Sequence, residues 1–155
     1  KEEIFATLLQ THLEGLWEAL DAQMSRATNF LELIHHVTTV YAGYMDENRR
    51  LFIIIHRTFP AVVWGPMAET APSELRKMMD SKGDLYDRFI ELAARILQRG
   101  IDEGVLRDLD PRRLAVILVG AMDSVNQLWL TEEEGRPFAD TLPLVLDVFL
   151  NGVRK

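Results

Sequence analysis

The chain has 155 residues, of which 48% are apolar and 26% charged, a balance typical of one globular domain and not of a disordered segment. It has no cysteine, which excludes disulfides, thiolate metal ligands and a cysteine nucleophile. The net charge of −7 makes the chain on its own a poor binder of nucleic acid, because an acidic surface repels phosphate.

Membrane and export signals are not evident. No apolar run reaches the ~18–20 residues of a membrane span, and the first residues show no signal-peptide pattern. We therefore expect no membrane partner. The chain starts without methionine and inside a helical pattern, so we also expect a further segment upstream.

The first part of the chain predicts three helices, because apolar side chains recur every three or four positions. They cover residues 1–22, 27–45 and 47–58. Ser25 and Thr28 are the candidate caps of the second helix, and Pro60 ends the third. Leu51–Ile55 would also suit a buried strand, but no other segment offers a strand to pair with it.

The middle of the chain predicts an apolar loop over residues 60–72, followed by a long helix over 73–103. Gly104 stands where a helix C-terminus favours a left-handed residue. Asp110 and Pro111 then mark the start of the next helix, since aspartate caps free N–H groups and proline fits the first turn.

The last two helices, over residues 111–132 and 138–153, are apolar on two sides. One broad face of the first of them carries Leu114, Ile117, Leu118, Ala121, Met122, Val125, Leu128 and Trp129. Because a small monomer cannot bury both sides, we expect the second sides to meet a copy of the chain in a four-helix interface. The expected interface residues are Val116, Val119, Gly120, Asp123, Gln127, Leu144 and Val148. The alternative is that both helices are central and wrapped by the other four.

Catalytic and cofactor motifs are missing from the sequence. There is no Gly-x-Ser-x-Gly, P-loop, Gly-x-Gly-x-x-Gly or His-Glu-x-x-His, so we expect neither an enzyme nor a bound cofactor. Glu32 and His35 have the Glu-x-x-His spacing of helical di-iron proteins, but no second copy exists and both are expected to face water.

Several segments resemble the TetR family of bacterial transcriptional repressors. They are Lys1-Glu2-Glu3-Ile4-Phe5, the stretch "ILQRGIDEGVLRDLDPRRLAVILVGAMD", and the late tryptophan Trp129. The likeness spans essentially all of residues 1–155, set against the C-terminal part of family members. It implies an all-α, six-helix effector-binding domain that forms a homodimer through its last two helices and acts in the bacterial cytoplasm. It also implies that DNA is contacted only by a helix-turn-helix domain upstream, which this chain lacks.

The resemblance further implies a small-molecule cavity among the first four helices. Aromatic and aliphatic walls favour a largely apolar effector, with tyrosine, histidine and asparagine as polar contacts. The expected ligand-binding residues are His12, Leu16, Trp17, Phe30, Ile34, Tyr41, His56, Phe59, Tyr86, Phe89, Met122 and Asn126. For both His12 and His56 a hydrogen-bonded core role is the alternative. Asp123 suits a cross-dimer hydrogen bond or a ligand contact, and exposure to solvent is its alternative. Two other functions stay open: a helical bundle that binds a metal or cofactor, and a helical interaction module without a cavity.

Overall fold

The computed structural model describes residues 2–58, 73–132 and 135–155, and these residues form helices and short turns. The helices are α1 (Glu2–Asp21), α2 (Phe30–Glu47), α3 (Arg49–Thr58), α5 (Ser73–Asp102), α6 (Pro111–Thr131) and α7 (Phe138–Val153), with a 3-10 turn at Ala22–Ser25. The prediction of an all-α fold is confirmed, and Leu51–Ile55 is helical.

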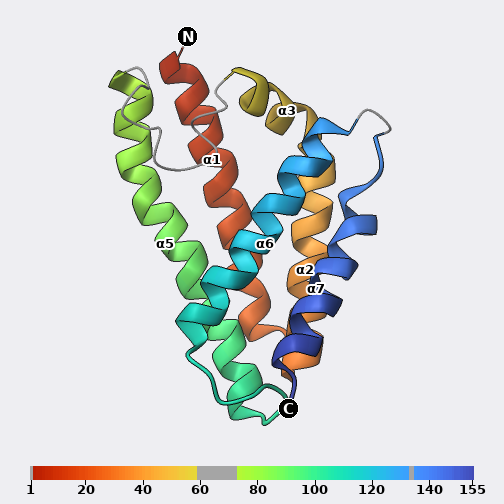
Figure 1. The fold of residues 1–155 in the computed structure, drawn as a ribbon. Helices are drawn as coiled ribbons and strands as arrows, with labels where there is room; N and C mark the ends of the chain where they lie inside the picture. Colours follow the sequence, from red (N-terminus) through yellow and green to blue (C-terminus); the bar gives the residue numbers. More distant parts are fainter. Residues whose placement is uncertain (1, 59–72, 133–134) are drawn as a thin grey trace.

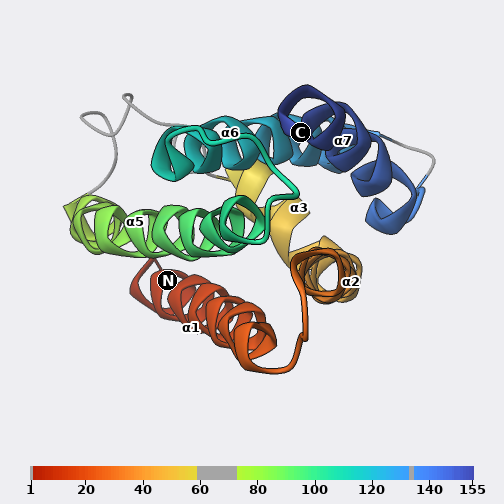
Figure 2. The same ribbon diagram turned by 90° about the horizontal axis from the view of Figure 1, so that it is seen from below.

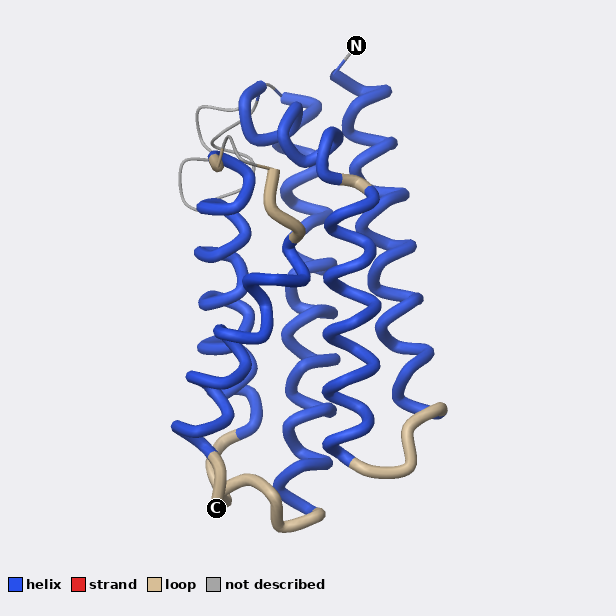
Figure 3. The backbone as a smooth tube through the Cα atoms, turned by 90° about the vertical axis from the view of Figure 1, so that its right-hand side faces the viewer, coloured by secondary structure: helices blue, strands red, loops and turns tan. Residues whose placement is uncertain are grey.

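The helices form a bundle (Figure 1), in which α5 lies between α1 and α6 (Figure 2). One side of α5 packs against α1 and another against α6, while α2 packs against α7. The short α3 packs against α6 and α2. The two chain ends lie at opposite ends of the bundle, so α1 begins far from where α7 ends (Figure 3).

The start of α2 differs from the prediction. The helix begins at Phe30 and not at residue 27, because the Asn29 side chain accepts a hydrogen bond from the Glu32 N–H at 2.9 Å and acts as the cap. Thr28 instead donates its N–H and its hydroxyl to the Glu32 carboxylate, both at 2.6 Å. The Ser25 hydroxyl bonds within the preceding turn.

The α5–α6 turn agrees with the prediction. Gly104 has a φ of +72°, the left-handed value that glycine adopts without strain. The Asp110 carboxylate accepts hydrogen bonds from the N–H groups of Arg112 and Arg113 at 2.9 and 3.0 Å, and Pro111 occupies the first turn of α6.

The buried side chains form two clusters. The larger lies toward the α5–α6 turn and includes the fully buried Phe30 and Leu97. The smaller surrounds Trp129 and Phe138, whose rings meet edge to face with centroids 5.1 Å apart. The Asp46 carboxylate on α2 caps α7 by accepting a hydrogen bond from the Phe138 N–H at 2.6 Å. This polar contact joins α2 to α7 beside the smaller cluster.

The face of α6 that points inward agrees in part with the prediction, since Leu114, Leu118 and Trp129 of the expected face are buried. Ile117 and Leu128 were expected inside, but each is 60% exposed. Val119 and Asp123 were expected at the interface between two copies, and both are half-buried in the single chain. The physical reason is that α6 is apolar on most sides, so its packing against α5 and α7 sets its rotation.

By length and composition alone α6 could also cross a membrane.

Candidate functional site

The two buried clusters meet at four half-buried side chains that pack against both: Tyr41 and Tyr44 of α2, Met122 of α6 and Leu146 of α7. We call these four residues the core junction. It lies where α2, α6 and α7 approach one another, and α1 reaches it through a hydrogen bond from Tyr44 to the His12 carbonyl oxygen. A junction of half-buried aromatic, thioether and aliphatic groups suits contact with an apolar molecule.

Asp123 follows Met122 on α6 and brings a carboxylate to this region. Burial raises the pKa of Asp123 to about 6, because a charged carboxylate loses hydration in an apolar environment. Burial also raises the pKa of the Tyr41 hydroxyl, and the nearby negative charge of Asp123 adds to that increase. Among the described residues, Asp123 has neither a hydrogen bond nor an ion pair.

Asn126 lies one helical turn beyond Asp123 on the same side of α6. Its side chain is buried, with 9% exposure, and its Oδ1 atom has no hydrogen-bond partner. Buried polar atoms in native proteins are nearly always paired, so an unpaired acceptor requires an explanation. Two polar residues on one face of α6 therefore present acceptors without donors.

The other predicted ligand-binding residues on α1 and α5 are partly used by the fold. The His12 ring is half-buried and its Nδ1 lies 2.9 Å from the Leu8 carbonyl oxygen of its own helix. Trp17 donates its indole N–H to the Arg88 carbonyl oxygen at 3.3 Å, and the Arg88 guanidinium lies 4.1 Å from the indole centroid. Phe89 is half-buried and packs against the larger cluster.

The structure gathers only part of the predicted ligand set. Tyr41 and Met122 are in the core junction, with Asn126 beside it. Leu16, Phe30 and Ile34 lie in the larger core cluster. The side chains of His56, Phe59 and Tyr86 lie outside the described residues. For all of these residues, ligand contact stays a prediction.

The predicted ligand set does not include Tyr44 and Leu146, and Asp123 was expected either at the dimer interface or in contact with a ligand. Tyr44 could have been found, because it follows Tyr41 by three positions on the same apolar stripe. Asp123 could have been paired with Asn126 by the same spacing. Leu146 lies on the apolar stripe of the last helix, but its contact with both clusters depends on the tertiary packing.

Of the Glu-x-x-His pair, Glu32 has a structural role. Hydrogen bonds from Thr28 lower the pKa of Glu32, whose carboxylate closes the start of α2. His35 is exposed. Among the described residues no group of three or more carboxylate or histidine side chains could hold a metal ion.

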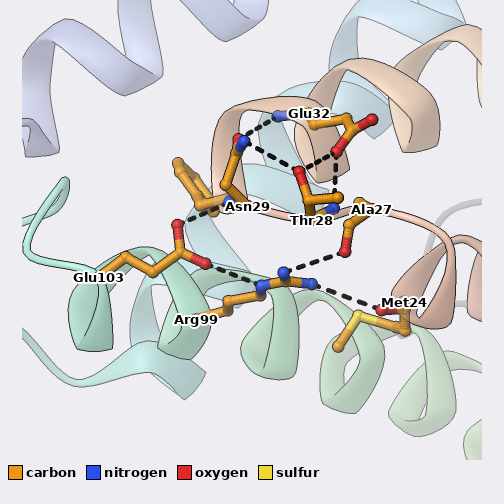
Figure 4. Close-up of polar contacts among 8 residues, drawn as sticks. Met24, Ala27, Thr28, Asn29, Glu32, Arg99 and Glu103 are labelled. Atoms are coloured by element: carbon orange, nitrogen blue, oxygen red, sulfur yellow. Dashed lines mark hydrogen bonds and ion pairs between the residues drawn. The ribbon is translucent and has the colours of Figure 1, made fainter.

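A polar cluster at the start of α2 links this helix to α5 (Figure 4). The Glu103 carboxylate accepts from the Phe30 N–H at 2.7 Å and from the Arg99 guanidinium at 2.9 Å. Arg99 also donates to the carbonyl oxygens of Met24 and Ala27 at 3.4 and 3.0 Å. This cluster holds together the end of the bundle opposite α3. None of its hydrogen bonds involves a residue of the core junction.

A second candidate site is an exposed apolar surface on two neighbouring helices. It consists of Val116, Ile117 and Leu128 on α6 and Leu144 and Val148 on α7, which are 48–66% exposed. We call it the α6–α7 face. Three of its members were predicted as interface residues. A Cβ atom added at Gly120 would have nothing within 4 Å, so a partner could approach the backbone there.

No protein-family model and no curated protein matches the chain, but solved structures share its fold. The ketosteroid transcriptional regulator KstR2 of Mycobacterium tuberculosis has a TM-score of 0.72 and 17% identity, over 99% of this chain and 73% of its own. PfmR, a TetR family transcriptional regulator from Thermus thermophilus, has a TM-score of 0.72 and 20% identity, over 97% of this chain and 76% of its own. Thermus thermophilus FadR, a TetR family transcriptional repressor in complex with lauroyl-CoA, has a TM-score of 0.65 and 20% identity, over 97% of this chain and 69% of its own. The chain therefore has the fold of these TetR-family regulators, as its sequence predicted.

Proposed function

We propose that this chain is the effector-sensing and dimerisation part of a TetR-like transcriptional regulator that acts in the bacterial cytoplasm and is not an enzyme. The fold shared with KstR2, PfmR and FadR supports this proposal. The single observation that carries it is the α6–α7 face, because it gives a helical bundle a surface suited to a second copy of itself.

The α6–α7 face has the composition of an interface core. Its five members are branched and apolar, and large exposed apolar patches on small proteins mark contact sites. Two copies related by a two-fold axis would pack α6 and α7 against their equivalents as a four-helix bundle. A stable contact needs about 800 Å² from each partner, an area that two helices of this length can provide.

The sensing step would use the core junction and α1. A small, largely apolar molecule would bind among Tyr41, Tyr44 and Met122, as the lauroyl-CoA complex of FadR suggests for this fold. Binding would favour one tilt of α1, which is linked to α2 by the Tyr44–His12 hydrogen bond. A DNA-reading domain preceding α1 would then change its spacing in the dimer, with a coupling free energy of about 1–3 kcal/mol.

The proposed dimer is tested by introducing charge into the α6–α7 face. Ile117→Asp and Val148→Asp place a charge on the proposed interface, while Leu31→Asp places one on an exposed leucine of α2. We expect light scattering to report dimers for the parent and Leu31→Asp chains, and folded monomers for the two interface variants. Unchanged dimers in Ile117→Asp and Val148→Asp, with helicity retained in all chains, would contradict the proposal.

A further inference from the structure

The inside of α6 presents two acceptors that the described part of the chain does not satisfy. Asn126 is buried to more than nine-tenths and its Oδ1 has no hydrogen-bond partner. Asp123, three residues earlier, is half-buried beside Tyr41, and no described cation or donor contacts its carboxylate. Residues three apart on a helix share one face, so a single ligand group could reach both.

The surroundings of this pair are apolar or aromatic. Met122 precedes Asp123 and belongs to the core junction with Tyr41 and Leu146. An unpaired carboxylate in such surroundings is unfavourable unless an opposite charge joins it. The face of an aromatic ring also attracts cations, so Tyr41 favours the same kind of partner.

We propose that the effector is an amine with an apolar body, whose ammonium group donates hydrogen bonds to the Asp123 carboxylate and the Asn126 carbonyl oxygen. This inference rests on the proposed function, because it names the chemical class that the same site binds. The apolar body would lie along Met122, Tyr41 and Leu146. An anionic head group is disfavoured, since it would place a second negative charge beside Asp123.

The test compares three probes with one ten-carbon chain and different head groups: decylamine, decanol and decanoate. Each is titrated into the protein by isothermal calorimetry at pH 7.5, below the concentration at which it forms micelles. We expect decylamine to bind at least tenfold more tightly than the other two. Asp123→Asn and Asn126→Leu, which keep the size of each side chain, should each weaken decylamine binding at least tenfold. Asp108→Asn, at an exposed carboxylate in the α5–α6 turn, should leave binding unchanged.

The possible outcomes separate this inference from the proposed function. Equal or tighter binding of decanol or decanoate, unaffected by Asp123→Asn, would overturn the amine inference and leave the ligand-binding proposal intact. Binding of decylamine that survives both α6 substitutions would also overturn it. Binding of none of the three probes to the folded parent chain would count against the ligand-binding proposal itself.

Discussion

The Tyr44 hydroxyl donates a hydrogen bond to the backbone carbonyl oxygen of His12, and so links the middle of α1 to the second half of α2. The neighbouring Tyr41 hydroxyl has no hydrogen bond to a described residue. Of these two tyrosines, which lie one turn apart on α2, Tyr44 is therefore the one whose hydroxyl holds α1.

Tyr44→Phe should lower the free energy of unfolding by about 1 kcal/mol, because it removes one net hydrogen bond and leaves the ring in place. Tyr41→Phe is the matched control, and we expect no loss of stability from it. Urea unfolding followed by circular dichroism measures both. Equal losses in the two variants would show that the Tyr44–His12 contact does not hold α1.

The close approach at Gly100 gives a second prediction. A Cβ atom there would lie 2.8 Å from Leu106 Cδ1 and 2.9 Å from Phe30 Cδ2, too close for either side chain to stay in place. Gly100→Ala should therefore destabilise the chain by about 1–3 kcal/mol. In Gly43→Ala on α2, where nothing lies within 4 Å, the helix preference of alanine should stabilise it by up to about 1 kcal/mol. Thermal unfolding of the pair distinguishes crowding from a general effect of alanine.

Asp123 predicts an unusual dependence of stability on pH. The folded pKa of about 6 exceeds the value of 3.8 for an unperturbed aspartate, so between about pH 4 and pH 6 the folded state holds a proton that the unfolded chain does not. The contribution of Asp123 to stability therefore falls as pH rises through this window. Asp123→Asn should be more stable than the parent at pH 7.5, by on the order of 2 kcal/mol.

The comparison of the two chains across pH provides the check. The advantage of Asp123→Asn should disappear near pH 4, where Asp123 is neutral in the folded chain. Asp108→Asn, which changes an exposed carboxylate, should show no such trend. A variant that is less stable than the parent at pH 7.5 would mean that Asp123 has a stabilising partner in the folded chain.

Glu103 predicts the opposite pH dependence. The hydrogen bond from the Phe30 N–H, followed by that from Arg99, lowers the pKa of Glu103 below 4.5. Its stabilising contribution is therefore complete above pH 4.5 and is lost as pH falls through the lower folded value. Glu103→Gln should reduce the urea midpoint at pH 7, and the difference from the parent should shrink at pH 3. A constant difference across this range would exclude the charge of Glu103 as its cause.

The helices and the α5–α6 turn could be predicted because their signals are local. Apolar side chains at helical spacing marked each segment, and Gly104 and Asp110 have the backbone and side-chain properties that a helix end and start require. The start of α2 was placed three residues early, since Thr28 and Asn29 both suit a cap and only the folded chain shows that Asn29 takes that position.

The rotation of α6 could not be predicted in the same way. Its apolar residues surround most of the helix, so their spacing does not decide whether Ile117 or Asp123 points inward. Packing against α5 and α7 decides it, and it exposes Ile117 while it buries much of Asp123. The cap that Asp46 provides for α7 joins residues 92 positions apart, and no local pattern announces such a contact.

Sedimentation equilibrium of the unaltered chain at micromolar concentration tests the central claim, that α6 and α7 join two copies. We predict a molar mass twice the 17.8 kDa of one chain. A well-folded species of 17.8 kDa at every concentration up to about 100 μM would contradict it.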